Sequence, residues 1–228
     1  MTISPKNLVF IGDCHIGNQN YNKKRFIKDL NKIDELDFDI VITGDMCEFI
    51  NQASFKYESQ TMSPKKQFKT FKKLFLPFAV KNKIIGCLKG NHEDRYFRKL
   101  DGLEDWCEEW GIKYNGRHLF FRYGGKYFYV HHPKSSATTT AGRDRIFQKM
   151  RNIRDADVYI SAHFHSLYQD RSFRYNKKGD LRPVYFGCSG SYLDYEDSYA
   201  EDKLYAPANL GCKLVGIYKG KVYMSDLL

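Results

Sequence analysis

Five short segments of this sequence consist almost entirely of residue types that bind divalent metal ions. They are Asp13-Cys14-His15, Gly44-Asp45, Gly90-Asn91-His92-Glu93, His131-His132 and His163-Phe164-His165. Carboxylate and imidazole ligands that need no thiolate suit hard to borderline ions such as Mn, Fe, Zn, Co or Ni. The sequence therefore predicts a metal centre assembled from segments that lie far apart in the chain.

Two of the segments place a pair of ligands two residues apart. In extended backbone, Asp13 and His15 project to the same side while Cys14 points to the other side. The same spacing pairs His163 with His165. Each pair is therefore expected to offer two ligands to one site.

A centre with two metal ions also needs a ligand that both ions share. A carboxylate at the end of a strand can bridge them, and Asp45 is the candidate. Asn91 can add a neutral amide oxygen, and its neighbour His92 then remains available to act on a substrate. The segments thus predict ligands and a catalytic group together.

Each segment alone also has a purely structural interpretation. Asp13 could cap the next helix, Gly44-Asp45 could be an ordinary turn, and His131-His132 could be a hydrogen-bonded pair in the core. Their joint occurrence, in this order and at the ends of apolar runs, favours the metal centre.

Buried strands precede the first three segments. Apolar runs at 7–11, 40–42 and 84–88 end at these segments, and helical patterns follow at 26–36 and from Ser63-Pro64 onward. Such β-α-β units predict an α/β sheet covered on both faces, with ligands beyond the carboxyl ends of its strands. We expect a loop near the active site at 51–62.

The second half of the chain is richer in β-structure. Residues 118–122 and 126–130 predict a hairpin that ends at His131-His132, and residues 158–161 predict the strand before His163. Residues 184–187 and a closing hairpin at 213–218 and 221–224 are expected to complete a second sheet. The hydroxyl-rich segment 134–143 lines the substrate entrance or simply connects to the next helix. We expect residues 1–228 to form one domain.

In this order the segments resemble the motifs of the calcineurin-like metallophosphoesterases: D-x-H, GD-x-x-D/E, GNH-D/E, a histidine at a strand end, and G-H-x-H. The resemblance covers residues 13–165 and implies an α/β (α+β) fold, a four-layer αββα sandwich of two mixed β-sheets flanked by helices. The sequence departs from the pattern twice. Ala162 stands before His163 in place of the usual glycine, and His131-His132-Pro133 stands where many members have His-Gly.

The resemblance implies two divalent metal ions, with manganese as the first choice and Fe, Zn, Ni, Co or Mg as alternatives. It implies three sets of metal ligands: Asp13, His15 and His165 for one ion, Asn91, His131 and His163 for the other, and Asp45 as the bridge. Within the histidine doublet we expect His131 to be the ligand and His132 to lie near the substrate.

The resemblance also implies the catalytic groups. His92 would contact the phosphate together with Asn91, and would protonate the leaving group after attack by a hydroxide that bridges the metals. Glu48 lies where the family often has a carboxylate that partners this histidine. An acid at the start of a surface helix is an equally good interpretation of Glu48.

We therefore expect hydrolysis of phosphoric esters, phosphodiesters in preference, with DNA or RNA as a plausible polymer. The formal net charge of +10 attracts polyanions, although basic clusters around Lys69 and Arg151 also fit solvated helix faces. One alternative is a phosphatase or phosphodiesterase of a small nucleotide. Another is a binding module that kept the fold and lost catalysis, which predicts missing ligands.

The remaining features predict a protein of the cytoplasm without a membrane partner. No apolar run reaches the roughly 20 residues that span a bilayer, and the first residues lack the apolar core of a secretory signal. Six cysteines are widely spaced and form no C-x-x-C pair, so we expect them to be reduced and mostly buried. The oligomeric state is left open.

Overall fold

Two mixed β-sheets face each other in this computed structural model, which describes residues 6–50, 54, 57–97, 102–134, 139–176, 178–204 and 206–227. The first sheet contains, in spatial order, β11 (Lys221–Asp226), β10 (Lys213–Tyr218), β1 (Lys6–Ile11), β2 (Asp39–Ile42), β3 (Ile84–Cys87) and β4 (Lys113–Tyr114). The second contains β5 (His118–Tyr123), β6 (Lys126–His131), β7 (Val158–Ser161), β9 (Leu181–Ser189) and β8 (Leu167–Tyr175).

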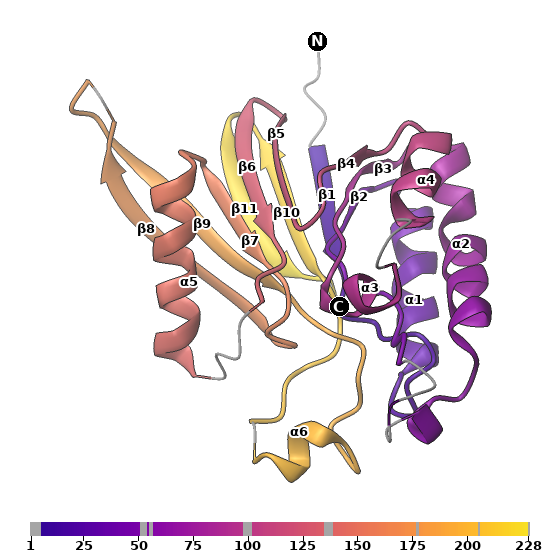
Figure 1. Cartoon of the computed structure of the whole chain (residues 1–228). Coiled ribbons are helices and arrows are strands. Elements are labelled where there is room, and N and C mark those ends of the chain that lie inside the picture. Colours follow the sequence, from indigo (N-terminus) through magenta and orange to yellow (C-terminus); the bar gives the residue numbers. More distant parts are fainter. Residues whose placement is uncertain are drawn as a thin grey trace.

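Helices cover the outer face of each sheet (Figure 1). The first sheet carries α1 (Lys23–Glu35), α2 (Pro64–Val80) and α4 (Gly102–Glu109), and the second carries α5 (Thr140–Ile153). Shorter elements are η1 (Tyr57–Ser59), α3 (Asn91–Tyr96) and α6 (Tyr199–Asp202). The four-layer arrangement of two mixed sheets flanked by helices confirms the predicted fold class.

Alternation along the strands divides the core into layers. In β1, Val9 and Ile11 pack against the helices, whereas Leu8 and Phe10 pack between the two sheets. Both sets are completely buried. The first sheet is therefore covered on both faces as expected, but by helices on one face and by the second sheet on the other.

The local sequence explains how the two long helices begin. The side chain of Asn22 caps α1 by accepting a hydrogen bond from the backbone N–H of Arg25. Pro64 occupies the first turn of α2, where its missing N–H costs no hydrogen bond. The apolar faces of both helices then pack against the first sheet.

Two expectations about the second half were wrong or incomplete. The closing hairpin belongs to the first sheet, because β10 pairs antiparallel with the edge of β1 that β2 leaves open, with Leu8 opposite Val215. The second sheet instead ends at β8, which the sequence did not predict. Every residue of β8 is exposed or half-buried, which fits a sequence without an apolar run.

The ligand segments follow β1, β2, β3, β6 and β7, at the carboxyl ends of strands that run parallel within each sheet. All six cysteines are free and buried, as predicted. Within the described residues no helix is long and apolar enough to cross a membrane. Parts of the expected loops at 51–62 and 134–143, namely 51–53, 55–56 and 135–138, lie outside the described residues.

Candidate metal centre

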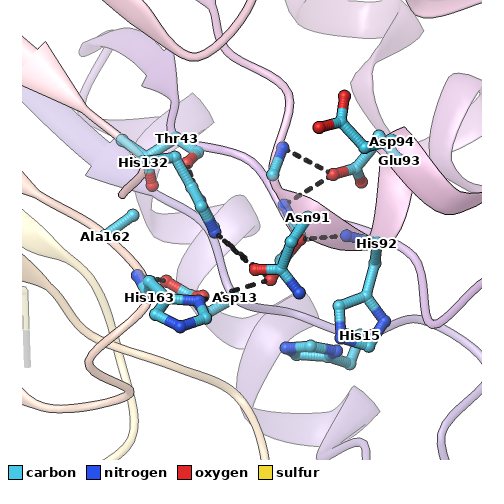
Figure 2. A network of polar contacts seen from close by, with 12 residues as sticks. Asp13, His15, Thr43, Asn91, His92, Glu93, Asp94, His132, Ala162 and His163 are labelled. Carbon is cyan, nitrogen blue, oxygen red and sulfur yellow. Dashed lines mark hydrogen bonds and ion pairs between the residues drawn. The ribbon is translucent and has the colours of Figure 1, made fainter. Parts of the chain in front are cut away.

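The structure brings the five ligand segments together. Two sets of carboxylate and imidazole atoms each lie within 4.8 Å of one another. We call them the outer group, made of Asp13, His15 and His165, and the inner group, made of Asp13, Asp45, His132 and His163. Asp13 belongs to both groups, and Asp45 forms a further set with His15 and His92. Figure 2 shows several of these side chains converging.

Five of these residues adopt left-handed backbone conformations. The φ angles are +48° for Asp13, +50° for His15, +50° for Asp45, +75° for His163 and +49° for His165. Such angles are uncommon for residues other than glycine, and they concentrate at functional sites. The extended backbone expected for the two ligand pairs was therefore wrong. The side chains of each pair reach the same site because the backbone turns sharply after each strand, at residues with positive φ angles.

Backbone hydrogen bonds hold two of these curled loops side by side. The N–H of Asp13 donates to Gly44 O at 2.9 Å, and the N–H of His15 donates to Asp45 O at 3.0 Å. The loop after β1 is thus fixed to the loop after β2. This contact holds the carboxylates of Asp13 and Asp45 next to each other.

In the outer group, Glu48 orients His15. The Nδ1 atom of His15 lies 2.9 Å from Glu48 Oε2, and its Nε2 atom lies 3.3 Å from His165 Nε2. Burial tends to lower the pKa of His15, but the hydrogen bond and charge of Glu48 raise it to about 9. A carboxylate behind an imidazole fixes its tautomer and turns the opposite nitrogen toward a metal ion.

In the inner group, the backbone orients His132. Its Nδ1 atom lies 2.8 Å from Thr43 O, so its Nε2 atom points at Asp45 Oδ2, 3.2 Å away. The same Nε2 atom lies 3.4 Å from Asn91 Oδ1 (Figure 2). Burial tends to lower the pKa of His132, but the charge of Asp45 raises it to about 9. His163 approaches the same Asp45 oxygen to within 4.0 Å through Nδ1.

The two adjacent histidines point in different directions, and His132 rather than the expected His131 lies beside Asp45. His131 ends β6 on the same face as Tyr129, on which its ring stacks, and it belongs to none of the ligand sets among the described residues. His132, which follows the strand, is completely buried and turns toward Asp45. Neighbouring residues at a strand end point in different directions, so only one member of the doublet reaches the centre.

Two buried carboxylate oxygens indicate that a cation fits here. Asp13 Oδ1 and Asp45 Oδ2 accept no hydrogen bond from any residue that the structure describes, although imidazole nitrogens of His165 and His132 lie 3.3 and 3.2 Å away. Burial alone would raise the pKa of both carboxyl groups. The neighbouring histidines nevertheless hold the pKa of Asp13 and that of Asp45 below the usual value. Buried anionic oxygens without donors, surrounded by imidazoles, form a donor set for divalent metals.

Sequence reasoning missed the role of Glu93. Its buried carboxylate accepts hydrogen bonds from the N–H groups of Asp45 and Met46, both at 2.9 Å, and of Gly90 at 2.8 Å. Burial raises the pKa of Glu93 to about 7. A Cβ atom on Gly90 would lie 2.0 Å from Asp45 Oδ1, so glycine is required there. Glu93 thus fixes the loop that presents Asp45.

Ser191 was also missed, since the sequence around it carries no recognisable motif. Its Oγ donates to Asp13 O at 2.9 Å, and the N–H of Tyr192 donates to the same oxygen at 3.2 Å. This support comes from 178 residues away in the chain. No local pattern could have indicated it.

His92 lies beside the outer group. Its ring contacts that of His15 edge-on, at a centroid distance of 4.5 Å, and its backbone N–H donates to Asp45 Oδ1 at 2.8 Å. The Nδ1 atom of His92 lies 2.5 Å from the backbone oxygen of Glu48, whereas the Glu48 carboxylate is 3.8 Å away. Glu48 therefore partners His92 through its backbone and His15 through its side chain.

The chain is similar to one protein family and to several solved structures. A family model described as calcineurin-like phosphoesterase matches residues 6–180. No curated protein matches the chain. Vps29 from Entamoeba histolytica, solved with zinc, is 14% identical over 97% of this chain and 98% of its own, with a TM-score of 0.49. An archaeal phosphodiesterase is 12% identical over 97% and 99%, with a TM-score of 0.49. At these values the two structures support no conclusion about activity.

Proposed function

The chain belongs to the calcineurin-like phosphoesterase family, and from this premise we propose that it is a hydrolase of phosphoric esters, phosphodiesters in preference, that works with two divalent metal ions. One observation carries the proposal. The outer and inner groups share the buried Asp13, and the inner group also contains the buried Asp45. One oxygen of each of these carboxylates has no hydrogen-bond donor among the described residues.

The ligands divide between two ions. Asp13, His15 and His165 would hold one ion, Asn91, His132 and His163 the other, and Asp45 would lie between them. The oxygen and nitrogen donors suit Mn first, and Fe, Zn, Ni, Co or Mg as alternatives. Bound in pairs, such ions lower the pKa of a water nucleophile and neutralise phosphoryl oxygens.

His92 is the proposed acid for the leaving group, with Asn91 beside it at the substrate. Because its Nδ1 faces the backbone oxygen of Glu48, its Nε2 is the atom available to the ester. Burial lowers the pKa of His92 to about 4, so the ring is neutral at pH 7 in the metal-free chain. The negative charge of a bound phosphate would have to raise this pKa before His92 could donate a proton.

Other features support the wider proposal. The strands β10 and β11 lie beyond the matched residues 6–180 and yet complete the first sheet, which supports a single domain over 1–228. The net charge of +10 supports a polyanionic substrate such as DNA or RNA. A small nucleotide remains the alternative substrate.

Metal analysis combined with a substrate panel tests the proposal. We expect about two equivalents of metal per chain, and faster turnover of an aryl phosphodiester than of an aryl monoester with Mn. His92→Ala should reduce turnover by roughly 100-fold or more without loss of metal. Full activity of this variant would refute the role of His92. Absence of bound metal would refute the centre itself, and inactivity on every nucleic acid would favour the small nucleotide.

A further inference from the structure

A cluster of positive charge lies next to the candidate metal centre. Three cationic side chains gather around one carboxylate, that of Asp94. The Nζ of Lys89 lies 3.3 Å from its Oδ1, the Nε of Arg117 donates to its Oδ2 at 3.0 Å, and the Nζ of Lys134 lies 3.4 Å from that Oδ2. We call these four residues the Asp94 cluster. Arg117 and Lys134 alone already outnumber the single carboxylate of Asp94, so the cluster keeps an excess of positive charge among the described residues.

Hydrogen bonds and small separations in sequence link the Asp94 cluster to the inner group. Asp94 follows Asn91 by three residues on α3, which places their Cβ atoms about 5–6 Å apart. The N–H of His132 donates to Arg117 O at 2.9 Å, and Arg117 Nη1 donates back to His132 O at 3.4 Å. Lys134 follows His132 by two residues. Figure 2 shows Asp94 and Glu93 just beyond Asn91.

From this geometry we infer that the Asp94 cluster binds a second phosphate group of the substrate, one adjacent to the phosphate that is hydrolysed. This inference rests on the proposed function and specifies its substrate class as phosphodiesters that carry a further phosphate. A nucleic-acid strand and a small nucleoside with two phosphates share this chemistry.

The three cations suit this role in different ways. Arg117 is only 15% exposed, and its guanidinium is already oriented by Asp94 and His132, so it presents donors in a fixed direction. Lys134 is 69% exposed and can swing toward an anion at little cost.

The test compares substrates that differ only in the second phosphate. The first is the nitrophenyl ester of thymidine 5′-phosphate, the second carries an additional 3′-phosphate, and the third continues into a short oligothymidylate. Release of nitrophenolate from the Mn-loaded full chain gives kcat/KM for each. We expect the second and third to exceed the first by about tenfold, and the preference to fall as salt rises.

Lys134→Gln isolates the cluster, because this exposed side chain packs little of the fold. We expect the preference for the second phosphate to fall about fivefold in this variant. Lys28→Gln, on the exposed face of α1, makes the same charge change away from the centre and should keep the wild-type preference. Equal kcat/KM on all three esters, or an equal loss of preference in both variants, would overturn the inference.

Binding separates this inference from the proposed function. Calorimetric titration of the Mn-loaded protein with thymidine 3′,5′-bisphosphate and with thymidine 5′-phosphate needs no turnover. Tighter binding of the bisphosphate, weakened by Lys134→Gln, would support the subsite even in a protein that hydrolyses nothing. Hydrolysis of all three esters with equal binding of both nucleotides would refute the subsite and leave the phosphoesterase intact. A preference that grows along the oligothymidylate identifies a strand as the source of the second phosphate.

Discussion

The outer and inner groups use the same donor types but are held in different ways. The inner His132 is completely buried, and the backbone oxygen of Thr43 fixes its ring. The outer His15 depends on the side chain of Glu48, and its partner His165 is 38% exposed. Backbone contacts constrain a ligand at lower entropic cost than a second side chain does. We therefore expect the inner ion to bind more tightly and the outer ion to exchange more readily.

Asp45→Asn should have the largest effect, because Asp45 belongs to the inner group and also forms a set with His15 of the outer group. The variant keeps the shape of the side chain and removes the shared charge. We expect metal affinity and turnover to fall more than about 100-fold. The metal content after gel filtration reports the loss of affinity, and kcat on an aryl phosphodiester reports the loss of turnover. Asp105→Asn, an exposed acid on α4, is the matched control. Retention of both ions in Asp45→Asn would show that the two groups do not share this ligand.

The adjacent histidines provide the next test. His132→Ala should weaken binding of the inner ion by roughly 100-fold, since it removes a buried imidazole that faces Asp45. His131→Ala should change that affinity less than about threefold, because His131 lies outside the ligand sets. Calorimetric titration of each metal-free variant with Mn compares the two affinities. The opposite ranking would restore His131 as the ligand.

Glu48→Gln tests the outer group alone. The amide can still hydrogen-bond His15 but carries no charge, so the outer ion should bind about 10-fold to 100-fold more weakly while the inner ion stays. Loss of one of two metal equivalents during dialysis would show this. Glu35→Gln, at the exposed end of α1, serves as the control. Equal loss of both ions would remove the distinction between the groups.

The smallest effect concerns pH in the metal-free protein. The pKa of His15 and that of His132 are about 9 in the folded chain, above their usual value of 6.5. A raised histidine pKa stabilises the fold fully below pH 6.5, and this contribution disappears as pH rises through 9. We expect the melting temperature in EDTA to fall by a few degrees between these values. The Mn-loaded protein should show a flatter profile, because the metal replaces the protons. An equal change of melting temperature with pH in the metal-free and the Mn-loaded protein would show that these histidines do not cause it.

Local patterns accounted for the parallel core of the molecule. Apolar runs before Asp13, Asp45 and Asn91 correctly predicted β1, β2 and β3, because a buried strand needs consecutive apolar side chains. The edge strand β8 could not be predicted in this way, because its sequence contains no run of consecutive apolar residues. Even its aromatic residues Phe173 and Tyr175 are exposed. The position of β10 beside β1 depends on which strand edge remains open, and no window of sequence contains that information.

The sequence by itself determined which residue types could form the centre and which strands they follow, because both depend on short-range order. Only the tertiary structure decided that His132 rather than His131 faces Asp45, and that Glu93 and Ser191 support the loops around it. These contacts join residues up to 178 positions apart. Glu93 joins two neighbouring loops of the first sheet, whereas His132 and Ser191 reach Asp45 and Asp13 from the second sheet. These contacts therefore exist only once the strands are ordered within a sheet and the two sheets are packed together.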